Sequence, residues 1–309
     1  MPDIGFSLQP RYDLPIAQVI ALLKASGFSA VSPVWSPELD LESIVASTQT
    51  HSMNIQSLHA PHKNISLLWN PDSPLSAETQ RNIFRCVDAC AQFQIPIMVL
   101  HGWSGLIYTF PKEPLNFRIF DEIVDYAQRQ GVFIAFENLE GEEYLNALLT
   151  RYQNLSHIGF CWDSGHDHCY PHALDFLESF GDRLIMTHLN DNLGLRDPSG
   201  IPSGDDDLHF LPYDGNIRWD DTIRRLKNAP RQAILNFELK LGSPSANPKD
   251  LLYDRIPLKD FLKEAGNRAR QIALLYEKLT SENIYQTTST QRTRPSACVI
   301  LGPIFLRIL

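Results

Sequence analysis

Eight short apolar runs, separated by longer amphipathic stretches, constrain the fold of this 309-residue chain more than any other feature. Strands buried on both faces of a parallel sheet read as continuous apolar runs, and IPIMVL and GVFIAF are of that kind. Their alternation with helix-like segments predicts repeated strand–helix units around a parallel sheet. The runs span residues 4–8, 30–35, 55–59, 96–101, 132–137, 158–163, 184–188 and 233–238.

The segments between the runs show helix signals. Residues 14–26 place apolar side chains at i, i+3, i+4 and i+7 and stop before Gly27, and residues 76–92, 116–130 and 256–279 are further predicted helices. Eight such units in a chain of this length predict an α/β fold of the (β/α)8 TIM barrel type. A doubly wound open sheet is the alternative. It is disfavoured because the first strand–helix turn lacks a Gly-rich phosphate-binding sequence.

The composition changes near the C-terminus. From about Thr287 the chain is polar and basic and then apolar, and it contains no acidic residue. We therefore expect one barrel domain over residues 1–286 and a C-terminal tail over 287–309, with poor order as one interpretation of the tail. The tail is too short for a membrane span and contains Pro303 and Arg307.

Charge and cysteine content narrow the functional class. With 36 Asp and Glu against 27 Lys and Arg, the net charge of -9 argues against a general nucleic-acid coat protein but leaves a local basic patch open. Five cysteines without framework spacing predict reduced thiols in a cytoplasmic protein. No signal peptide is visible and no apolar run is long enough to span a bilayer, so we expect no membrane partner.

Six consecutive runs end in a histidine or a carboxylate, the side chains that commonly bind metals. In a barrel, all strands open their carboxyl ends on one face, so these side chains should meet in a small volume together with His166, one turn after the sixth run. Unpaired charges in such a place are costly, so six in a row are hard to explain by packing. The six residues are His59, His101, Glu137, Asp163, His188 and Glu238.

The long connection over residues 190–216 adds further candidates. Asp207 and His209 are two residues apart, so an extended segment presents both on one side. Asp191 closely follows His188 and is a candidate for the same site. Mixed imidazole and carboxylate ligands suit Zn, Mn, Fe or Co, and Mg less well. Taken singly, His59 or His101 could equally be a satisfied buried histidine.

These motifs, in order, resemble a known family. HAP, ENL, DSGH, HLND, D-x-H followed by DGNI, and a final glutamate are similar to the xylose isomerase-like TIM barrel superfamily. That superfamily holds sugar and sugar-phosphate isomerases and epimerases, and also the apurinic-site endonucleases. The resemblance covers residues 4–279 and is specific for the superfamily but not for a substrate.

The isomerase and epimerase branch implies a one-metal site. By resemblance, Glu137, Asp163, His188 and Glu238 hold a divalent metal, with Mn, Zn, Co and Mg all open. The resemblance also implies that Glu137 and Glu238 exchange protons with the substrate carbons through a metal-stabilised enediolate, while His166 orients the sugar. Lys240 and Arg196 are candidate phosphate or carboxylate contacts, with a surface role as the alternative.

The endonuclease branch implies three zinc ions on nine positions, and all nine have matching residue types. Against this branch, His62 stands where a tyrosine is expected, and no arginine-rich loop is present to bind a DNA backbone. The primary hypothesis is therefore a sugar or sugar-phosphate isomerase or epimerase. The alternative is a multinuclear zinc phosphodiesterase, and a degenerate binding barrel is a third option. Nucleic acid is a disfavoured partner that stays open, and a homo-oligomer is a further expectation. The nine positions are His59, His101, Glu137, Asp163, His166, His188, Asp207, His209 and Glu238.

Overall fold

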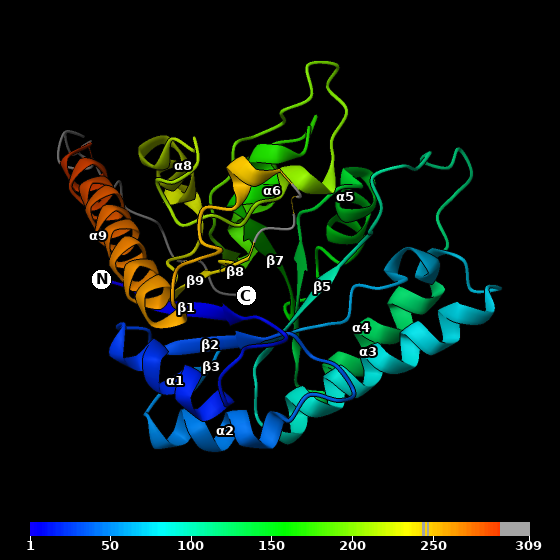
Figure 1. Ribbon diagram of the computed structural model, residues 1–309. Helices are drawn as coiled ribbons and strands as arrows, with labels where there is room; N and C mark the ends of the chain where they lie inside the picture. Colours follow the sequence, from blue (N-terminus) through cyan, green and yellow to red (C-terminus); the bar gives the residue numbers. More distant parts are fainter. Residues whose placement is uncertain (243–244, 246, 291–309) are drawn as a thin grey trace, which may run out of the picture.

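The computed structural model describes residues 1–242, 245 and 247–290 (Figure 1). Within these residues the strands occupy eight successive positions, and every strand pair is parallel. The third predicted strand is divided in two at Gln56, whose backbone N–H still donates to Val31 O at 2.9 Å. The strands are β1 (Asp3–Leu8), β2 (Ala30–Pro33), β3 (Asn54–Ile55), β4 (Ser57–His59), β5 (Ile97–His101), β6 (Phe133–Glu137), β7 (Ile158–Asp163), β8 (Leu184–His188) and β9 (Ile234–Phe237).

The strands close into a barrel. One sheet has the order β3-β2-β1-β9 and the other β4-β5-β6-β7-β8. A parallel bridge between Val34 and His59 joins β2 to β4, and a second between Leu189 and Phe237 joins β8 to β9. Because both edges are joined, the predicted (β/α)8 barrel is confirmed and the doubly wound open sheet is excluded.

Helices surround the strands (Figure 1). The predicted helical segments are all helical, and Gly131 ends α4 with a positive φ of 71°, a conformation that glycine adopts at little cost. The helices are α1 (Ile16–Ala25), α2 (Leu41–Thr50), α3 (Pro74–Gln92), α4 (Arg118–Gln130), α5 (Glu142–Arg151), α6 (Ser164–Cys169), α7 (Phe176–Phe180), α8 (Trp219–Arg225) and α9 (Leu258–Thr290).

Helix α9 packs closely on the end of α1. A Cβ atom at Gly266 would lie 2.0 Å from Ser26 O, so only glycine fits here, and Arg270 donates to the same carbonyl at 2.6 Å. The helix extends past the predicted end at 279, so the predicted boundary at 287 falls inside it. Residues 291–309 lie outside the described residues, and a separate tail stays a prediction. No helix in the described ranges has the length and apolarity needed to cross a membrane.

The barrel interior is layered along the strands. Side chains on a strand point alternately to the two faces, so residues two apart share a face. Val99, Ala135, Cys161 and Met186 form a small buried layer inside β5 to β8. Two residues further along each strand, the next layer consists of His101, Glu137, Asp163 and His188. Strand periodicity therefore brings four of the predicted ligands together at the carboxyl end of the barrel.

Candidate metal centre

All nine predicted side chains gather at the carboxyl ends of the strands, in three groups. Within each group the potential ligand atoms lie within 4.8 Å of one another. Two of these groups share Glu137, which also forms a further group with Cys161 and His188, so that carboxylate is at the centre of the cluster. The groups are Glu137 with Asp163, His188 and Glu238; His59 with His101 and Glu137; and His166 with Asp207 and His209.

The first group is built around His188. Its Nδ1 lies 2.7 Å from Glu137 Oε1 and 2.9 Å from Glu238 Oε2. The Glu137 side chain is fully buried, whereas that of Glu238 is 18% exposed. Burial opposes protonation of the imidazole, but Cys161, Glu137 and Glu238 raise the pKa of His188 well above its ordinary value. The surrounding groups therefore favour positive charge at this point, as a cation-binding site does.

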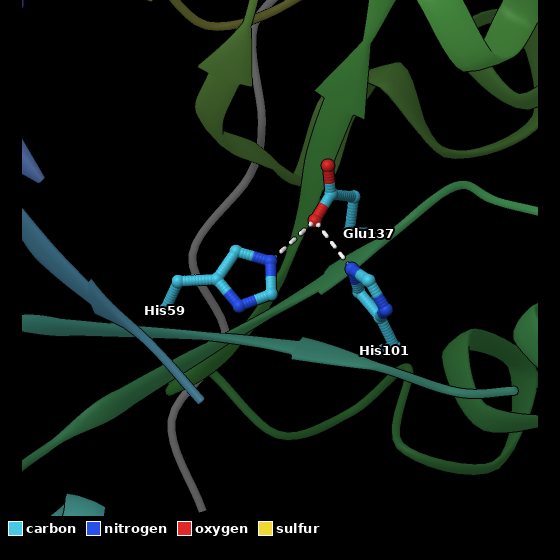
Figure 2. A group of neighbouring side chains, drawn as sticks. All are labelled: His59, His101 and Glu137. Atoms are coloured by element: carbon cyan, nitrogen blue, oxygen red, sulfur yellow. Dashed lines mark hydrogen bonds and ion pairs between the residues drawn. The ribbon is translucent and has the colours of Figure 1, made fainter. Parts of the chain in front are cut away.

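The second group lies on the other oxygen of Glu137 (Figure 2). His59 Nε2 and His101 Nε2 approach Glu137 Oε2 to 3.2 and 3.0 Å. Burial lowers the pKa of His101 to about 4 against the opposing effect of Glu137, so this ring is neutral at neutral pH. A neutral imidazole is the form that binds a metal.

Three histidines share a hydrogen-bonding pattern typical of metal ligands. His59, His166 and His209 each place Nδ1 against a backbone carbonyl, which requires a protonated Nδ1. In a neutral ring, Nε2 then has only a lone pair, yet it faces a carboxylate oxygen of Glu137 or Asp207 at 3.2, 3.5 and 2.9 Å, respectively. A lone pair on Nε2 and a carboxylate oxygen attract each other only when a proton or a cation lies between them. Histidine ligands in metalloproteins are commonly held this way, with Nδ1–H on a carbonyl.

The DSGH segment explains how Asp163 is held. Asp163 caps α6 by accepting from His166 N at 2.8 Å, and Asn190 Nδ2 donates to its two oxygens at 3.1 and 2.9 Å. Ser164 Oγ bonds Asn190 O at 2.8 Å, and a Cβ at Gly165 would lie 1.9 Å from Asn190 Oδ1. Glycine is therefore required so that Asn190 can reach Asp163. Burial raises the pKa of this carboxylate to about 6, although His166 opposes the shift.

Asn138 is a second positioning residue that the sequence reasoning missed. Its side chain donates to Asp163 O at 2.9 Å and accepts from Asp163 N at 2.7 Å. Its own carbonyl accepts from His166 Nδ1 at 2.8 Å. Asn138 therefore fixes both residues from the neighbouring strand end. Its signal in the sequence is an asparagine directly after the predicted ligand Glu137. Asn190 similarly follows two residues after His188.

Asp191 has a different role from the one expected. The sequence groups it with His188, but its side chain accepts four hydrogen bonds, from the N–H groups of Asn192, Tyr213 and Ile217 and from Nε1 of Trp219, at 2.9 to 3.1 Å. It does not line the cavity over the site. This carboxylate holds the connection between β8 and α8 in place.

This role makes Asp191→Asn a test of loop anchoring. An amide offers one acceptor oxygen, so two of the four buried donors lose their partner, at about 1–3 kcal/mol each. We expect the free energy of unfolding in urea to fall by at least about 2 kcal/mol. The exposed Asp220→Asn serves as the control and should change it by less than about 0.5 kcal/mol. Equal effects of the two substitutions would contradict the assignment.

A cavity of about 300 Å³ lies above the cluster and is lined by seven of the nine predicted residues. Asp163 and His188 lie beneath them, buried. The wall also includes His62, whose pKa is lowered by burial, by His59 and by Lys240 against the opposing charges of Glu238 and Glu137. Arg196 is not part of the wall and instead pairs with two aspartates, at 2.9 and 2.6 Å. The seven are His59, His101, Glu137, His166, Asp207, His209 and Glu238.

Comparisons with known proteins agree with this architecture. The uncharacterised protein y4fM of Sinorhizobium fredii is 28% identical over 272 residues, which cover 74% of this chain and 82% of that protein. The structure of L-ribulose 3-epimerase superposes with a TM-score of 0.66 at 12% identity, covering 96% of this chain and 100% of that chain. That of the IOLI protein with a binding zinc atom gives 0.64 at 16% identity, covering 91% and 98%.

A family profile also matches most of the chain. Residues 20–256 match the family described as xylose isomerase-like TIM barrel, which is more than half of the chain. The matched segment includes all nine predicted ligands. With its closed parallel barrel, the chain belongs to the xylose isomerase-like TIM barrel family.

Proposed function

We propose that this protein is a metal-dependent isomerase or epimerase of a sugar or sugar phosphate. The observation that supports it most is the convergence of two carboxylates, Glu137 and Glu238, on His188 Nδ1 at 2.7 and 2.9 Å beneath a cavity of small-molecule size. Two carboxylates close to one substrate carbon are what a two-base proton transfer needs. Solved structures of similar fold include an L-ribulose 3-epimerase and a D-allulose 3-epimerase in complex with D-allulose.

The donor set fits a divalent metal. Glu137, Asp163, His188 and Glu238 would hold it, with three carboxylates and one imidazole, a set compatible with Mn, Zn, Co or Mg. When bound, such a metal polarises the substrate carbonyl and its neighbouring hydroxyl and so acidifies the C–H bond between them. Asp163 is buried beneath the cavity and does not line it, so in this proposal it holds the metal and does not transfer protons.

The two glutamates then divide the proton transfer. Glu238 is the partly exposed carboxylate, and it removes the proton from the carbon next to the carbonyl. Glu137, which lines the cavity, gives a proton taken up from solvent to the adjacent carbon or to the opposite face, and the proton on Glu238 is released to solvent, which restores both carboxylates. His166 lines the cavity with its Nδ1 held by Asn138 O, and its Nε2 forms a hydrogen bond with a substrate hydroxyl, which orients the sugar.

Product analysis tests this proposal. The metal-loaded protein should convert a ketose or ketose phosphate into its epimer or aldose isomer, detected by NMR of the reaction mixture. Chelation should stop the conversion and the added metal should restore it. A loaded protein that leaves a full panel of pentoses, hexoses and their phosphates unchanged would contradict the proposal.

A second candidate, a zinc phosphodiesterase, is favoured by the two further ligand groups. His59 with His101, and Asp207 with His166 and His209, could each hold another metal beside the first, and clusters of metals clamp phosphates in hydrolases. Against it, the cavity wall among the described residues contains a single lysine and no arginine, which suits a small molecule better than a nucleic-acid backbone.

Metal content separates the two candidates. Elemental analysis of the purified protein should give about one divalent metal per chain if the first group alone is a metal site. His209→Ala should then leave the metal content unchanged, because His209 is outside that group. A content of about three per chain, falling by about one in His209→Ala, would instead support the phosphodiesterase. Cleavage of a duplex containing an abasic site would confirm that second reading.

A further inference from the structure

Lys240 is the one lysine or arginine in the cavity wall among the described residues. It lies two residues after Glu238, just beyond β9, and its backbone N–H donates to His209 O at 3.1 Å. Residues two apart on an extended segment share a side, so Lys240 and Glu238 both face the cavity. Gln9, which follows β1, the strand paired with β9, is also part of the cavity wall.

The ammonium group of Lys240 has no carboxylate partner in the part of the chain that the structure describes. No hydrogen bond or ion pair joins it to Glu238 or to the other acidic side chains of the cavity. Other partly buried cations have protein partners: Arg196 pairs with Asp206 and Asp250, Arg225 with Asp167 and Asp175, and Arg183 donates to three backbone carbonyls. A half-buried ammonium without a protein partner is satisfied by water or by an anionic ligand.

The wall of the cavity opposite Lys240 offers hydroxyl groups and a carboxylate instead of a positive charge. In the closed order of strands, β5 is half a turn of the barrel away from β9, and Ser104 follows it. Glu140 and Tyr170 follow the next two strands and continue this wall. It therefore offers a hydroxyl, a carboxylate and a phenol, which suit the hydroxyl groups of a polyol and repel an anion.

We propose that Lys240 binds an anionic group of the substrate, a phosphate or a carboxylate, so that the substrate is an acidic sugar. This inference rests on the proposed function for the sugar part of the molecule. The anionic group lies at Lys240 and Gln9, the reacting carbons lie over Glu137 and Glu238, and the free hydroxyl groups face the wall of Ser104 and Glu140. A cavity of about 300 Å³ is at the small end of ligand sites, which fits a single monosaccharide with one such group.

Binding measured without turnover tests the inference. Calorimetric titration of the metal-loaded protein with D-fructose 6-phosphate, D-glucuronate and D-fructose should show tighter binding of at least one charged sugar by about 10-fold, the effect of one charge-assisted contact. The two charged probes distinguish a phosphate from a carboxylate. Lys240→Met should remove that preference and leave binding of D-fructose within about 2-fold. Lys240→Arg should keep most of it.

Lys63→Met is the matched control, because it removes one positive charge from an exposed residue near the mouth that does not line the cavity. It should leave the preference intact. A wild-type protein without preference for either charged sugar, or a Lys240→Met variant that keeps the preference, would overturn the inference. A protein that binds charged sugars through Lys240 but leaves the full panel of sugars and sugar phosphates unchanged would keep the inference and overturn the proposed function.

Discussion

The Glu137→Gln variant is expected to lose metal binding and activity together. Glu137 receives imidazoles on both oxygens, from His188 on Oε1 and from His59 and His101 on Oε2. Although burial opposes ionisation, His188, His101 and His59 hold the pKa of this carboxylate well below its ordinary value, so it is charged. A glutamine has no charge, and its amide nitrogen must face an imidazole on one side. Metal affinity should fall by about 100-fold or more, and turnover by at least about 1,000-fold.

Titration of the metal-free variant with Zn²⁺ or Mn²⁺ measures the first effect, and product formation at saturating metal measures the second. The control is Glu78→Gln, which neutralises an exposed carboxylate on α3 and should change neither. A Glu137→Gln protein that binds metal like the wild type would show that this carboxylate is not a ligand. The role assigned to the first group would then be wrong.

The Glu238→Gln variant is expected to separate catalysis from metal binding. Glu238 approaches only one of the imidazoles, His188, and its partly exposed side chain faces the cavity. Three ligands of the group remain, so metal should bind, with reduced affinity. An amide cannot take a proton from carbon, and the loss of a general base typically costs about 100- to 10,000-fold in turnover. We expect a fall in kcat of that size with a smaller change in KM.

Glu140→Gln is the matched comparison for this variant, because Glu140 is a cavity carboxylate that faces substrate hydroxyl groups in our proposal but lies outside all three ligand groups. Its turnover should stay within about 10-fold of the wild type. Steady-state kinetics at saturating metal compares the two variants. If Glu238→Gln is no slower than Glu140→Gln, Glu238 is not the base that removes the proton.

Much of the fold follows from local sequence signals. The continuous apolar runs predict the strands to within one or two residues at most ends, because full burial leaves no other residue type at those positions. The break at Gln56 between β3 and β4 and the extension of α9 to Thr290 were not predicted. Both depend on packing against distant segments, as when Gly266 approaches Ser26 across 240 residues of chain.

The identity of the site residues could be predicted from the sequence, but their arrangement in space could not. Strand ends identify the ligands, because a barrel brings those ends together. Between β7 and β8, however, the register shifts by one residue, so that Cys161 pairs with Met186 and Asp163 with His188. Without the shift, Asp163 would face Thr187, whose side chain points to the other side of the strand. No local sequence pattern indicates such a shift, and the contacts that Asn190 makes with Asp163 depend on it.

Solvent deuterium exchange tests the central claim most directly, because it reports proton transfer at carbon whatever the final product. The metal-loaded wild type, incubated in deuterated water with free and phosphorylated ketoses, should incorporate deuterium at the carbon next to the carbonyl of one of them. The chelated protein and the Glu238→Gln variant should incorporate none beyond the uncatalysed background. Exchange at the wild-type rate in Glu238→Gln, or its absence in the loaded wild type with every ketose, would contradict proton transfer through the paired glutamates.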